Sequence, residues 1–352
     1  PGPVCIHDLD GDGRTEVICF FRREQIDATA TSMANVVIQI RDGATGCVKK
    51  EAAPARLRLC RGKGANWVHQ RILIANFRGL PSPQDFVVKR GVHLLAFDSN
   101  LDILWEYESP WSEYGHCPAY IPAIGDIDGD GKDEVNGGYF LLDHDGMPLW
   151  EHDLAPHMDS VAIAPWDDGN MRAVCSGHGH VLDECGNVIV ALGSERVPHG
   201  QEVRVGRFRV GDVEPQMILR RNGHSTGALV TDVAGETLSE FDLNPSPNNT
   251  GMEVVHWHGE DAPALLCNGG MLWDPLRGAG IPFPDLPPPE PIGRMAWYDC
   301  IPADVCGDSR EEAILYNPWT TRIYVYTQHD SDRTEFTGFK AGPRQYNPRL
   351  MD

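Results

Sequence analysis

The chain has 352 residues and carries 30 lysines and arginines against 51 aspartates and glutamates, a formal net charge of −21. Nucleic-acid recognition needs clustered lysine and arginine that displace counterions from phosphates, so we expect no nucleic acid as a partner. No apolar run reaches the roughly 18 residues of a membrane-spanning helix. The 37 glycines and 27 prolines favour short strands joined by turns, because each one inside a helix costs roughly 1–3 kcal/mol.

An acidic turn recurs along the chain. Residues 8–17 read DLDGDGRTEV, and residues 126–135 read DIDGDGKDEV. A divergent copy, DVCGDSREEA, occupies residues 304–313, with Cys306 at the position of the second aspartate. Weaker copies begin at four further positions, which are Asn76, Asp167, Asp212 and Gly259. Seven units of about 45 residues, the first one longer, therefore make up the chain.

Each unit has the same pattern: an apolar run before the turn, a second run after it, and then a hairpin. The second runs lie, in chain order, at residues 16–21, 85–89, 133–140, 172–177, 216–221, 263–268 and 312–317. The first four hairpins lie at residues 38–46, 94–105, 140–150 and 180–190. Four short strands in every unit are typical of a β-propeller. We therefore predict an all-β fold, a seven-bladed β-propeller of four-stranded blades, as a single domain over residues 1–352. A pair of β-sandwiches is the alternative.

The acidic turns have the composition of a calcium site. In D-x-D-G-D-G-x-x-E, closely spaced carboxylates supply the oxygen ligands that Ca²⁺ prefers, and the glycines allow the positive φ that wraps a backbone around an ion. The candidate ligands are Asp8, Asp10, Asp12, Glu16, Asp126, Asp128, Asp130 and Glu134. The alternative is that these side chains only cap the backbone of ordinary turns. We expect structural calcium that joins two strands, with weak or no binding at the copy that contains Cys306.

If the acidic turns lie at one end of the blades, the first strands begin and the second strands finish at the other end. Guanidinium groups bind carboxylates through two parallel hydrogen bonds, so cations gathered at this mouth fit a ligand that carries a carboxylate. The alternative is that these positions are merely solvated strand ends. The candidate residues are His116, His157, Gln201 and Arg294 before first strands, and His178, Arg220, Arg221 and Tyr316 after second strands.

Two stretches resemble a known family. Residues 125–135 (GDIDGDGKDEV), followed by residues 141–150 (LLDHDGMPLW) and by His157-Met-Asp159, resemble the calcium-binding propellers of the rhamnogalacturonan lyases. Residues 303–317 (ADVCGDSREEAILYN) resemble the signature of their final blade. The count of seven blades and the two histidines of the fourth unit, about twenty residues apart, resemble more closely the related ulvan lyases and the rhamnose–glucuronate lyases of gum arabic type.

The resemblance implies a polysaccharide lyase that cleaves a uronic-acid-containing, rhamnose-rich glycan by β-elimination. The base and the acid would be the pair His157 and His178, and Arg220 or Arg221 would hold the uronate carboxylate. The tyrosine of the seven-bladed relatives is replaced at the start of the fifth unit by His199, the third candidate catalytic residue. Other candidates for the role of that tyrosine are Tyr114, Tyr120, Tyr139 and Tyr316.

Two alternative functions stay open. A related propeller glycoside hydrolase releases rhamnose from glucuronate at the opposite mouth, where His7 lies beside the first acidic turn. The other alternative is a non-catalytic propeller that binds glycans. In each case we expect an acidic polysaccharide or oligosaccharide as the partner, a monomeric chain, and a secreted or periplasmic location.

Overall fold

The computed structural model describes residues 4–22, 36–59, 70–111, 117–166, 169–211, 214–243, 251–288, 298–308, 310–317 and 320–328. Two predicted substrate-binding residues, His116 and Arg294, lie outside the described residues, and so does Tyr114. Within them the chain is almost entirely β-structure, with one short helix, α1 (Ala55–Leu59). No helix there is long and apolar enough to cross a membrane. The predicted all-β class is confirmed.

The strands form seven antiparallel sheets, six of four strands and one of three in the described part of the chain. The first three sheets comprise β1 (Val4–His7), β2 (Glu16–Arg22), β3 (Val36–Asp42) and β4 (Val48–Ala52); β5 (Gln70–Ala75), β6 (Asp85–Arg90), β7 (His93–Asp98) and β8 (Ile103–Glu108); and β9 (Ala123–Gly125), β10 (Glu134–Asn136), β11 (Phe140–Leu142) and β12 (Pro148–Glu151). The last four comprise β13 (Val161–Pro165), β14 (Met171–Cys175), β15 (His180–Leu182) and β16 (Val188–Ala191); β17 (Glu202–Gly206), β18 (Gln216–Arg220), β19 (Gly227–Thr231) and β20 (Thr237–Asp242); β21 (Glu253–Val255), β22 (Leu265–Asn268), β23 (Met271–Asp274) and β24 (Ala279–Pro282); and β25 (Asp299–Ala303), β26 (Glu312–Tyr316) and β27 (Ile323–Tyr326).

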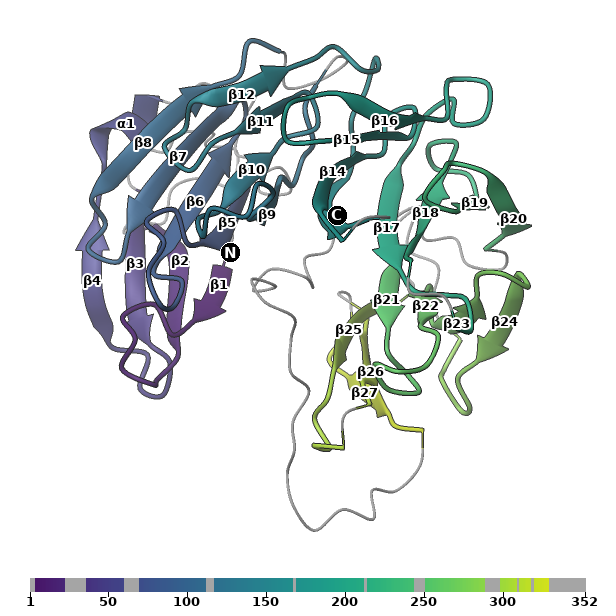
Figure 1. The fold of residues 1–352 in the computed structure, drawn as a ribbon. Helices are drawn as coiled ribbons and strands as arrows, with labels where there is room; N and C mark the ends of the chain where they lie inside the picture. The colour runs from purple at the N-terminus through teal and green to yellow at the C-terminus, as the bar shows by residue number, and fades with distance from the viewer. Residues whose placement is uncertain are drawn as a thin grey trace. The chain divides into compact units, whose positions relative to one another are not determined.

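The sheets divide into two compact units (Figure 1). The first unit covers Pro1–Met158 and Glu184–Gly186, and the second covers Asp159–Asp183 and Asn187–Asp352. Within every sheet the strands lie side by side in chain order. Within each unit, the first strand of one sheet contacts the first strand of the next sheet: β1, β5 and β9 in the first unit, and β13, β17, β21 and β25 in the second. Seven sheets of this form fit the predicted seven-bladed β-propeller.

The hydrophobic core lies between neighbouring sheets. The middle strands β6 and β7 are buried at every position, because neighbours cover both of their faces. The outer strand β8 has no buried residue and alternates between exposed and half-buried positions over its last four residues. In the second unit, one apolar cluster joins Val174 of the fourth sheet to Leu219 and Leu229 of the fifth. Packing between sheets therefore fixes the strand ends on which the candidate residues stand.

The predicted acidic turns connect the first strand of a sheet to the second. Among the described residues, a side-chain oxygen closes the turn in five of the sheets. The residue at the start of the second strand accepts a hydrogen bond of 2.7–3.1 Å from a backbone N–H seven or eight residues earlier in the chain. These acceptors are Glu16, Asp85, Glu134, Gln216 and Glu312. The second and fifth sheets share this bond although their turns lack the Asp-Gly repeat, so the bond defines the turn better than the repeat does.

Truncation of the core between sheets should destabilise the second unit. Leu229 is fully buried, and we expect Leu229→Ala to lower the free energy of unfolding by about 2–5 kcal/mol, because it removes apolar contacts and leaves a cavity. Val210 is 82% exposed, so Val210→Ala serves as the control, with an expected change within about 0.5 kcal/mol. Urea denaturation measures both variants, and equal effects would contradict the packing described.

Candidate functional site

In the second unit, the predicted strand starts and strand ends meet. Glu202, the first residue of β17, pairs with Arg220 at the end of β18. Asp299 of β25 pairs in the same way with Tyr316 of β26. The Gln201 N–H donates a hydrogen bond to the carbonyl of Arg220, 2.8 Å away. Gln201 with Arg220, and Asp299 with Tyr316, therefore stand where a first strand begins and a second strand finishes, and the roles predicted for Gln201, Arg220 and Tyr316 stay predictions.

A close backbone contact joins the segments that carry His178 and His199. The Gly200 N–H donates a hydrogen bond to the carbonyl of Gly177, 2.8 Å away. A Cβ atom at residue 200 would lie only 2.1 Å from the carbonyl oxygen of Ser176, so the contact requires glycine. The turn before β15 therefore packs directly on the segment that leads into β17, and the two histidines are carried by touching stretches of backbone.

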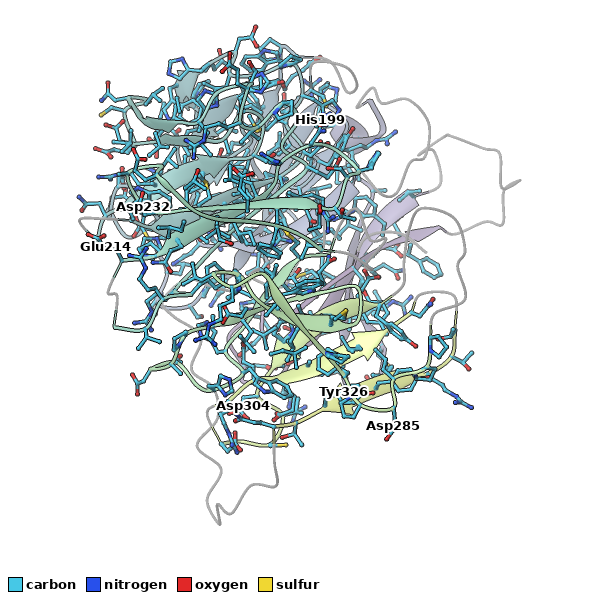
Figure 2. The ribbon with its side chains drawn as sticks, turned by 90° about the vertical axis from the view of Figure 1, so that its right-hand side faces the viewer. His199, Glu214, Asp232, Asp285, Asp304 and Tyr326 are labelled. Atoms are coloured by element: carbon cyan, nitrogen blue, oxygen red, sulfur yellow. The ribbon has the colours of Figure 1, made fainter. Side chains whose placement is uncertain are left out.

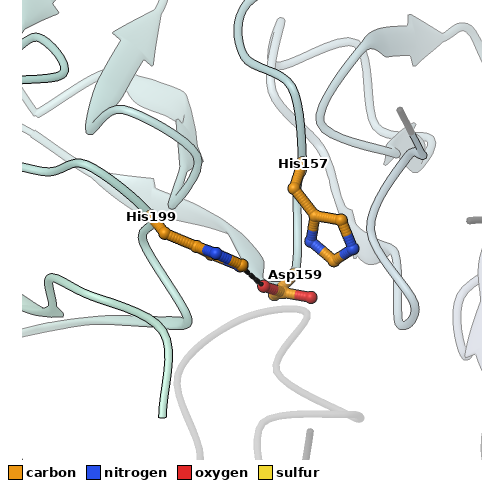
Figure 3. Close-up of side chains that lie close together, drawn as sticks. All are labelled: His157, Asp159 and His199. Carbon is orange, nitrogen blue, oxygen red and sulfur yellow. Dashed lines mark hydrogen bonds and ion pairs between the residues drawn. The ribbon is translucent and has the colours of Figure 1, made fainter. Parts of the chain in front are cut away.

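Asp159 holds the imidazole of His199 (Figure 3). Nε2 of His199 lies 2.8 Å from Oδ2 of Asp159. The carboxylate is buried, whereas 42% of the His199 side chain is exposed. Such a carboxylate fixes the orientation of the ring and compensates the charge that the ring gains with a proton. Figure 2 shows His199 well apart from Asp304, which belongs to the acidic turn of the seventh sheet.

His178 is oriented by the backbone rather than by a carboxylate. Its Nδ1 lies 2.8 Å from the carbonyl oxygen of Val197. Because a carbonyl oxygen only accepts hydrogen bonds, Nδ1 carries the proton in the neutral ring and Nε2 keeps the lone pair. Burial, and then the neighbouring His178, lower the pKa of His180, so His180 favours its neutral form. Of these two histidines, His178 is therefore the one whose backbone contact places the lone pair on Nε2.

His157 lies in the first unit, where it contacts a tyrosine. The Tyr120 hydroxyl lies 3.2 Å from Nε2 of His157, and the two rings meet edge to face at 5.7 Å between centroids. Tyr139, by contrast, is fully buried and its hydroxyl donates to the carbonyl of Ala155. Tyr120, one of the tyrosines considered for the missing role, thus contacts a predicted catalytic histidine. Residue patterns alone could not rank Tyr120 above the other tyrosines.

The two predicted arginines have different environments. Arg220 is fully buried: its Nε lies 3.3 Å from Oε2 of Glu202, and its Nη1 donates to the carbonyl of Ser225 at 3.0 Å. Arg221 keeps 37% of its side chain exposed and pairs with Glu240 across 3.1 Å. Consecutive residues at a strand end point to opposite sides, so one arginine of the pair faces inward. Arg221 is therefore the arginine of this pair that a ligand can reach.

A row of buried carboxylates, which the sequence reasoning missed, lies at the same end of the second unit. Asp159, Glu202, Glu253 and Asp299 stand at the first residue of β13, β17, β21 and β25 or up to two residues before it, and each is at most 7% exposed. Arg204 neutralises part of this charge, with Nη2 3.4 Å from Glu253 and 3.8 Å from Glu202. One such residue stands at the first strand of each of these four sheets, and this recurrence is the signal that could have found them. This end of the second unit is mixed in charge rather than cationic.

One carboxyl group of this row titrates near neutral pH. Burial, and then the charge of Glu202, raise the pKa of Asp299 to about 6. Burial, and then the charge of Asp299, raise the pKa of the facing Tyr316 to about 12. Glu202 instead accepts two backbone N–H bonds of 2.7 and 3.0 Å from the segment before β21, and it pairs with Arg220. Asp299 therefore changes its protonation state close to neutral pH, while the Tyr316 phenol stays protonated.

The first acidic turn, between β1 and β2, surrounds a lysine. Oxygens of Asp8, Asp10 and Glu16 lie within 4.8 Å of one another. Lys49 reaches this group from β4, with Nζ 2.6 Å from Asp10, 2.8 Å from Glu16 and 3.7 Å from Asp12. The lysine lowers the pKa of Asp10 through this hydrogen bond. All four predicted ligands of the turn are present, and three of them already contact an ammonium group.

In the second acidic turn, between β9 and β10, no ion pair joins the closing residue Glu134 to a lysine among the described residues. Oxygens of Asp126, Asp128 and Glu134 lie within 4.8 Å of one another. Glu134 is fully buried, and its Oε1 has no hydrogen-bond partner. Burial, and then Asp128, Asp126 and Asp130, raise the pKa of Glu134 to about 9. Lys132 approaches only Asp130, at 3.5 Å. A hard cation with oxygen ligands fits this donor set, because it would satisfy the orphaned oxygen.

The third copy, between β25 and β26, is built differently. Cys306 replaces the second carboxylate, and its backbone N–H donates to Oε2 of Glu312 at 3.1 Å. Asp304 accepts a backbone bond within the turn, and Asp308 forms an ion pair with Arg310. The expectation of weak or absent calcium binding here stays a prediction.

His7 lies at the turn end of the first sheet. It is half-buried, and its Nε2 lies 3.0 Å from the carbonyl oxygen of Pro83. The register pairs His7 with Glu16, which places the histidine directly before the acidic turn. The alternative hydrolytic role of His7 is untested by this position.

Replacement of Asp299 by asparagine is expected to stabilise the protein in a pH-dependent way. The pKa of Asp299 rises from 3.8 to about 6 on folding, so stability is lost as the pH rises through this range. Asparagine avoids that loss, which is at most about 3 kcal/mol. The melting temperature of Asp299→Asn should therefore exceed that of the wild type near pH 8 and match it at about pH 4. A gain of equal size at both pH values would contradict the titration assigned to Asp299.

Comparisons of the sequence and of the structure with known proteins both find rhamnogalacturonan lyases. No protein-family model matches the chain. A rhamnogalacturonan endolyase, YesW of Bacillus subtilis (strain 168), is 27% identical over 358 residues, which cover 92% of this chain and 56% of that protein. The crystal structure of rhamnogalacturonan lyase YesW has a TM-score of 0.69 at 20% identity, covering 92% of this chain and 60% of that one. The Bacillus licheniformis rhamnogalacturonan lyase PL11 has a TM-score of 0.66 at 18% identity, with coverage of 92% and 60%.

A third solved structure, the exotype rhamnogalacturonan lyase YesX, has a TM-score of 0.65 at 20% identity, with coverage of 92% and 61%. The chain spans between 56% and 61% of the length of these relatives. The structural comparisons concern the fold, and the sequence comparison covers nearly all of the chain. The resemblance to the rhamnogalacturonan lyases that residues 125–135 and 303–317 predicted is therefore confirmed in both sequence and fold.

Proposed function

We propose that this chain forms the catalytic propeller of a polysaccharide lyase, which cleaves a rhamnose-rich glycan next to a uronic acid by β-elimination. Relatives that cover nearly all of the chain are named as rhamnogalacturonan lyases, which supports a polysaccharide as the substrate class. The observation that carries the proposal is the backbone contact at Gly200, which joins the segments of His178 and His199 beside the reachable Arg221. The proposed partner is an acidic polysaccharide or oligosaccharide.

β-Elimination at a uronate needs three chemical functions. A base removes the proton at C5, next to the carboxylate, and the released electron pair forms a C4=C5 double bond. The bond from C4 to the glycosidic oxygen breaks at the same time, and an acid protonates that leaving oxygen. A cation beside the carboxylate stabilises the negative charge that develops there in the transition state. The elimination is redox-neutral, so no oxidant or reductant takes part.

The two histidines of the second unit divide the proton transfers. His178 supplies the base, because its Nδ1 donates to Val197 and its Nε2 therefore carries the lone pair. His199 supplies the acid, because the buried Asp159 compensates the charge of the protonated ring. His157, which contacts Tyr120 in the first unit, stays a predicted catalytic residue.

Arg221 holds the carboxylate of the substrate. Its exposed guanidinium pairs with the exposed Glu240, and a uronate can take the place of that partner. Arg220 has a structural role, because it is buried against Glu202. Glu202 in turn accepts a hydrogen bond from the backbone before β21. Tyr316 stands half-buried at the same end and stays a predicted substrate-binding residue, together with Gln201.

A polymer-degrading lyase works where its polymer lies. The proposal therefore includes the secreted or periplasmic location expected from the sequence. The monomeric state expected from the sequence also stays a prediction, because no partner chain is needed for the histidines and the arginine described above.

Loss of the proposed base should lower turnover. We expect His178→Ala to reduce kcat by about 10²–10⁴-fold. We expect Arg221→Ala to reduce kcat and also to raise KM. The matched controls are His258→Ala and Arg207→Ala, which change exposed residues just after β21 and β17, at the other end of these strands, and should keep the wild-type rate. The rate is the growth of ultraviolet absorbance from the unsaturated uronate, with rhamnogalacturonan, ulvan and gum arabic as substrates.

Other outcomes of the same assay would support the alternatives. Sugar release without the absorbance, lost in His7→Ala and kept in His178→Ala, would replace the lyase by the glycoside hydrolase. Binding of these glycans without turnover, unaffected by His178→Ala, would replace it by a non-catalytic propeller.

We also propose that calcium bound at the second acidic turn stabilises the third sheet. Asp126, Asp128, Asp130 and Glu134 would hold the ion, which supplies positive charge to carboxylates that the turn packs together. The orphaned Oε1 of Glu134 supports this choice. The role is structural, because the turn joins two strands at the end of the sheet away from the strand starts.

Chelation should therefore lower the melting temperature. A ligand that binds only the folded state contributes about 2.7 kcal/mol at one hundred times its Kd. We expect the melting temperature to fall with a calcium chelator and to recover with excess calcium. The double variant Asp126→Asn, Asp128→Asn should melt at the same temperature in both conditions. A wild-type melt that ignores the chelator, with no metal in the purified protein, would refute the calcium proposal.

A further inference from the structure

The first and second acidic turns have nearly the same sequence but different surroundings. In the first turn, the Lys49 ammonium lies 2.6 Å from Asp10 and 2.8 Å from Glu16. These two residues, with Asp8, also form the group whose oxygens could hold a metal ion. The ammonium group therefore occupies the neighbourhood in which an ion would have to sit, and it already supplies hydrogen bonds to the carboxylates.

The fourth strand determines this difference. Lys49 occupies the extra position of an irregularity in β4, between the pairs Arg41–Val48 and Ile40–Lys50. The third sheet has the same irregularity in β12, between the pairs Leu142–Pro148 and Leu141–Trp150. The residue at the extra position there is Leu149, which is 40% exposed and has no charge to offer. The two turns thus differ in the residue at the same extra position of the fourth strand, which is Lys49 in the first sheet and Leu149 in the third.

The second acidic turn retains an unmet demand for a cation. Glu134 is fully buried, one of its oxygens accepts the Ile127 N–H at 2.8 Å, and the other has no hydrogen-bond partner. Lys132 contacts Asp130 at 3.5 Å and Nε2 of His144 at 2.8 Å. Its side chain is 34% exposed. A buried carboxylate oxygen without a partner is costly unless an ion or a donor meets it.

We propose that Lys49 is a covalently attached replacement for calcium: the first acidic turn binds no ion, and the calcium of the two repeat turns is confined to the third sheet. The inference rests on the calcium proposal made above for the second turn. It divides the eight predicted ligands into a working set, Asp126, Asp128, Asp130 and Glu134, and a set satisfied by the chain itself, Asp8, Asp10, Asp12 and Glu16.

One other sheet follows the same rule with arginine. In the second sheet, the guanidinium of Arg78 lies 2.8 Å from the buried Asp85, the residue that closes that turn. In the seventh sheet, Arg310 pairs with Asp308 inside the turn. A cation from the protein thus meets the carboxylate that closes the turn in the first and second sheets, whereas the Arg310–Asp308 pair of the seventh sheet repeats the spacing of Lys132–Asp130 in the third.

Calcium stoichiometry tests the assignment on the full chain. We expect Asp128→Asn to lose one equivalent of bound calcium relative to the wild type, and the matched Asp10→Asn to lose none. Metal content after equilibrium dialysis measures both. Loss of an equivalent in Asp10→Asn would overturn the proposal, because the first turn would then hold an ion beside its lysine.

Removal of the ammonium group supplies the converse experiment. Lys49→Leu gives the first turn the residue that stands at the equivalent position of the third sheet, and we expect this variant to gain one equivalent of calcium. Its melting temperature should become more sensitive to the chelator than that of the wild type. Unchanged stoichiometry in a folded Lys49→Leu, checked by circular dichroism, would overturn the replacement by Lys49. If the wild type bound no calcium and Lys49→Leu gained one equivalent, calcium at the second turn would be refuted, whereas the replacement of calcium by Lys49 at the first turn would be supported.

Discussion

A hydrogen bond from a side-chain oxygen to a backbone N–H seven or eight residues earlier closes the turn between the first and second strands in five sheets. The acceptor is buried, so whatever charge it carries must be met inside the protein. Glu16 meets Lys49, Asp85 meets Arg78, and Gln216 avoids the problem by being neutral. The variety of charges around the turns follows from this one constraint.

The same constraint separates stability from chemistry. Because the strands are antiparallel, a turn fixed at one end of a sheet leaves the strand starts at the other end free to vary. In the second unit those starts carry Asp159, Glu202, Glu253 and Asp299, and the strand ends opposite carry Arg220 and Tyr316. Substitutions in the site residues therefore leave the turn bonds intact, and charges in the turns can change without altering the histidines.

Residue patterns were enough to predict the seven sheets, the place of the acidic turns and the position of Gln201, Arg220 and Tyr316 at strand starts and strand ends. They could not tell which arginine of the pair Arg220–Arg221 faces inward, because that depends on the twist of one strand end. Lys49 was equally invisible as a partner of Glu16, since a register irregularity in β4 aims it at the turn. Asp159 and Glu202 were overlooked because single acids at strand starts resemble solvated ends until burial is known.

Gly200 has a consequence for how this site can be altered. Backbone touches backbone where Gly200 meets Ser176 and Gly177, so no side-chain rotamer adjusts the separation of the segments that bear His178 and His199. Engineering that aims at a new glycan cannot retune the spacing of the two rings by repacking neighbours. Diversity has to come from the periphery, through exposed groups such as Arg221, while the centre behaves as a rigid template.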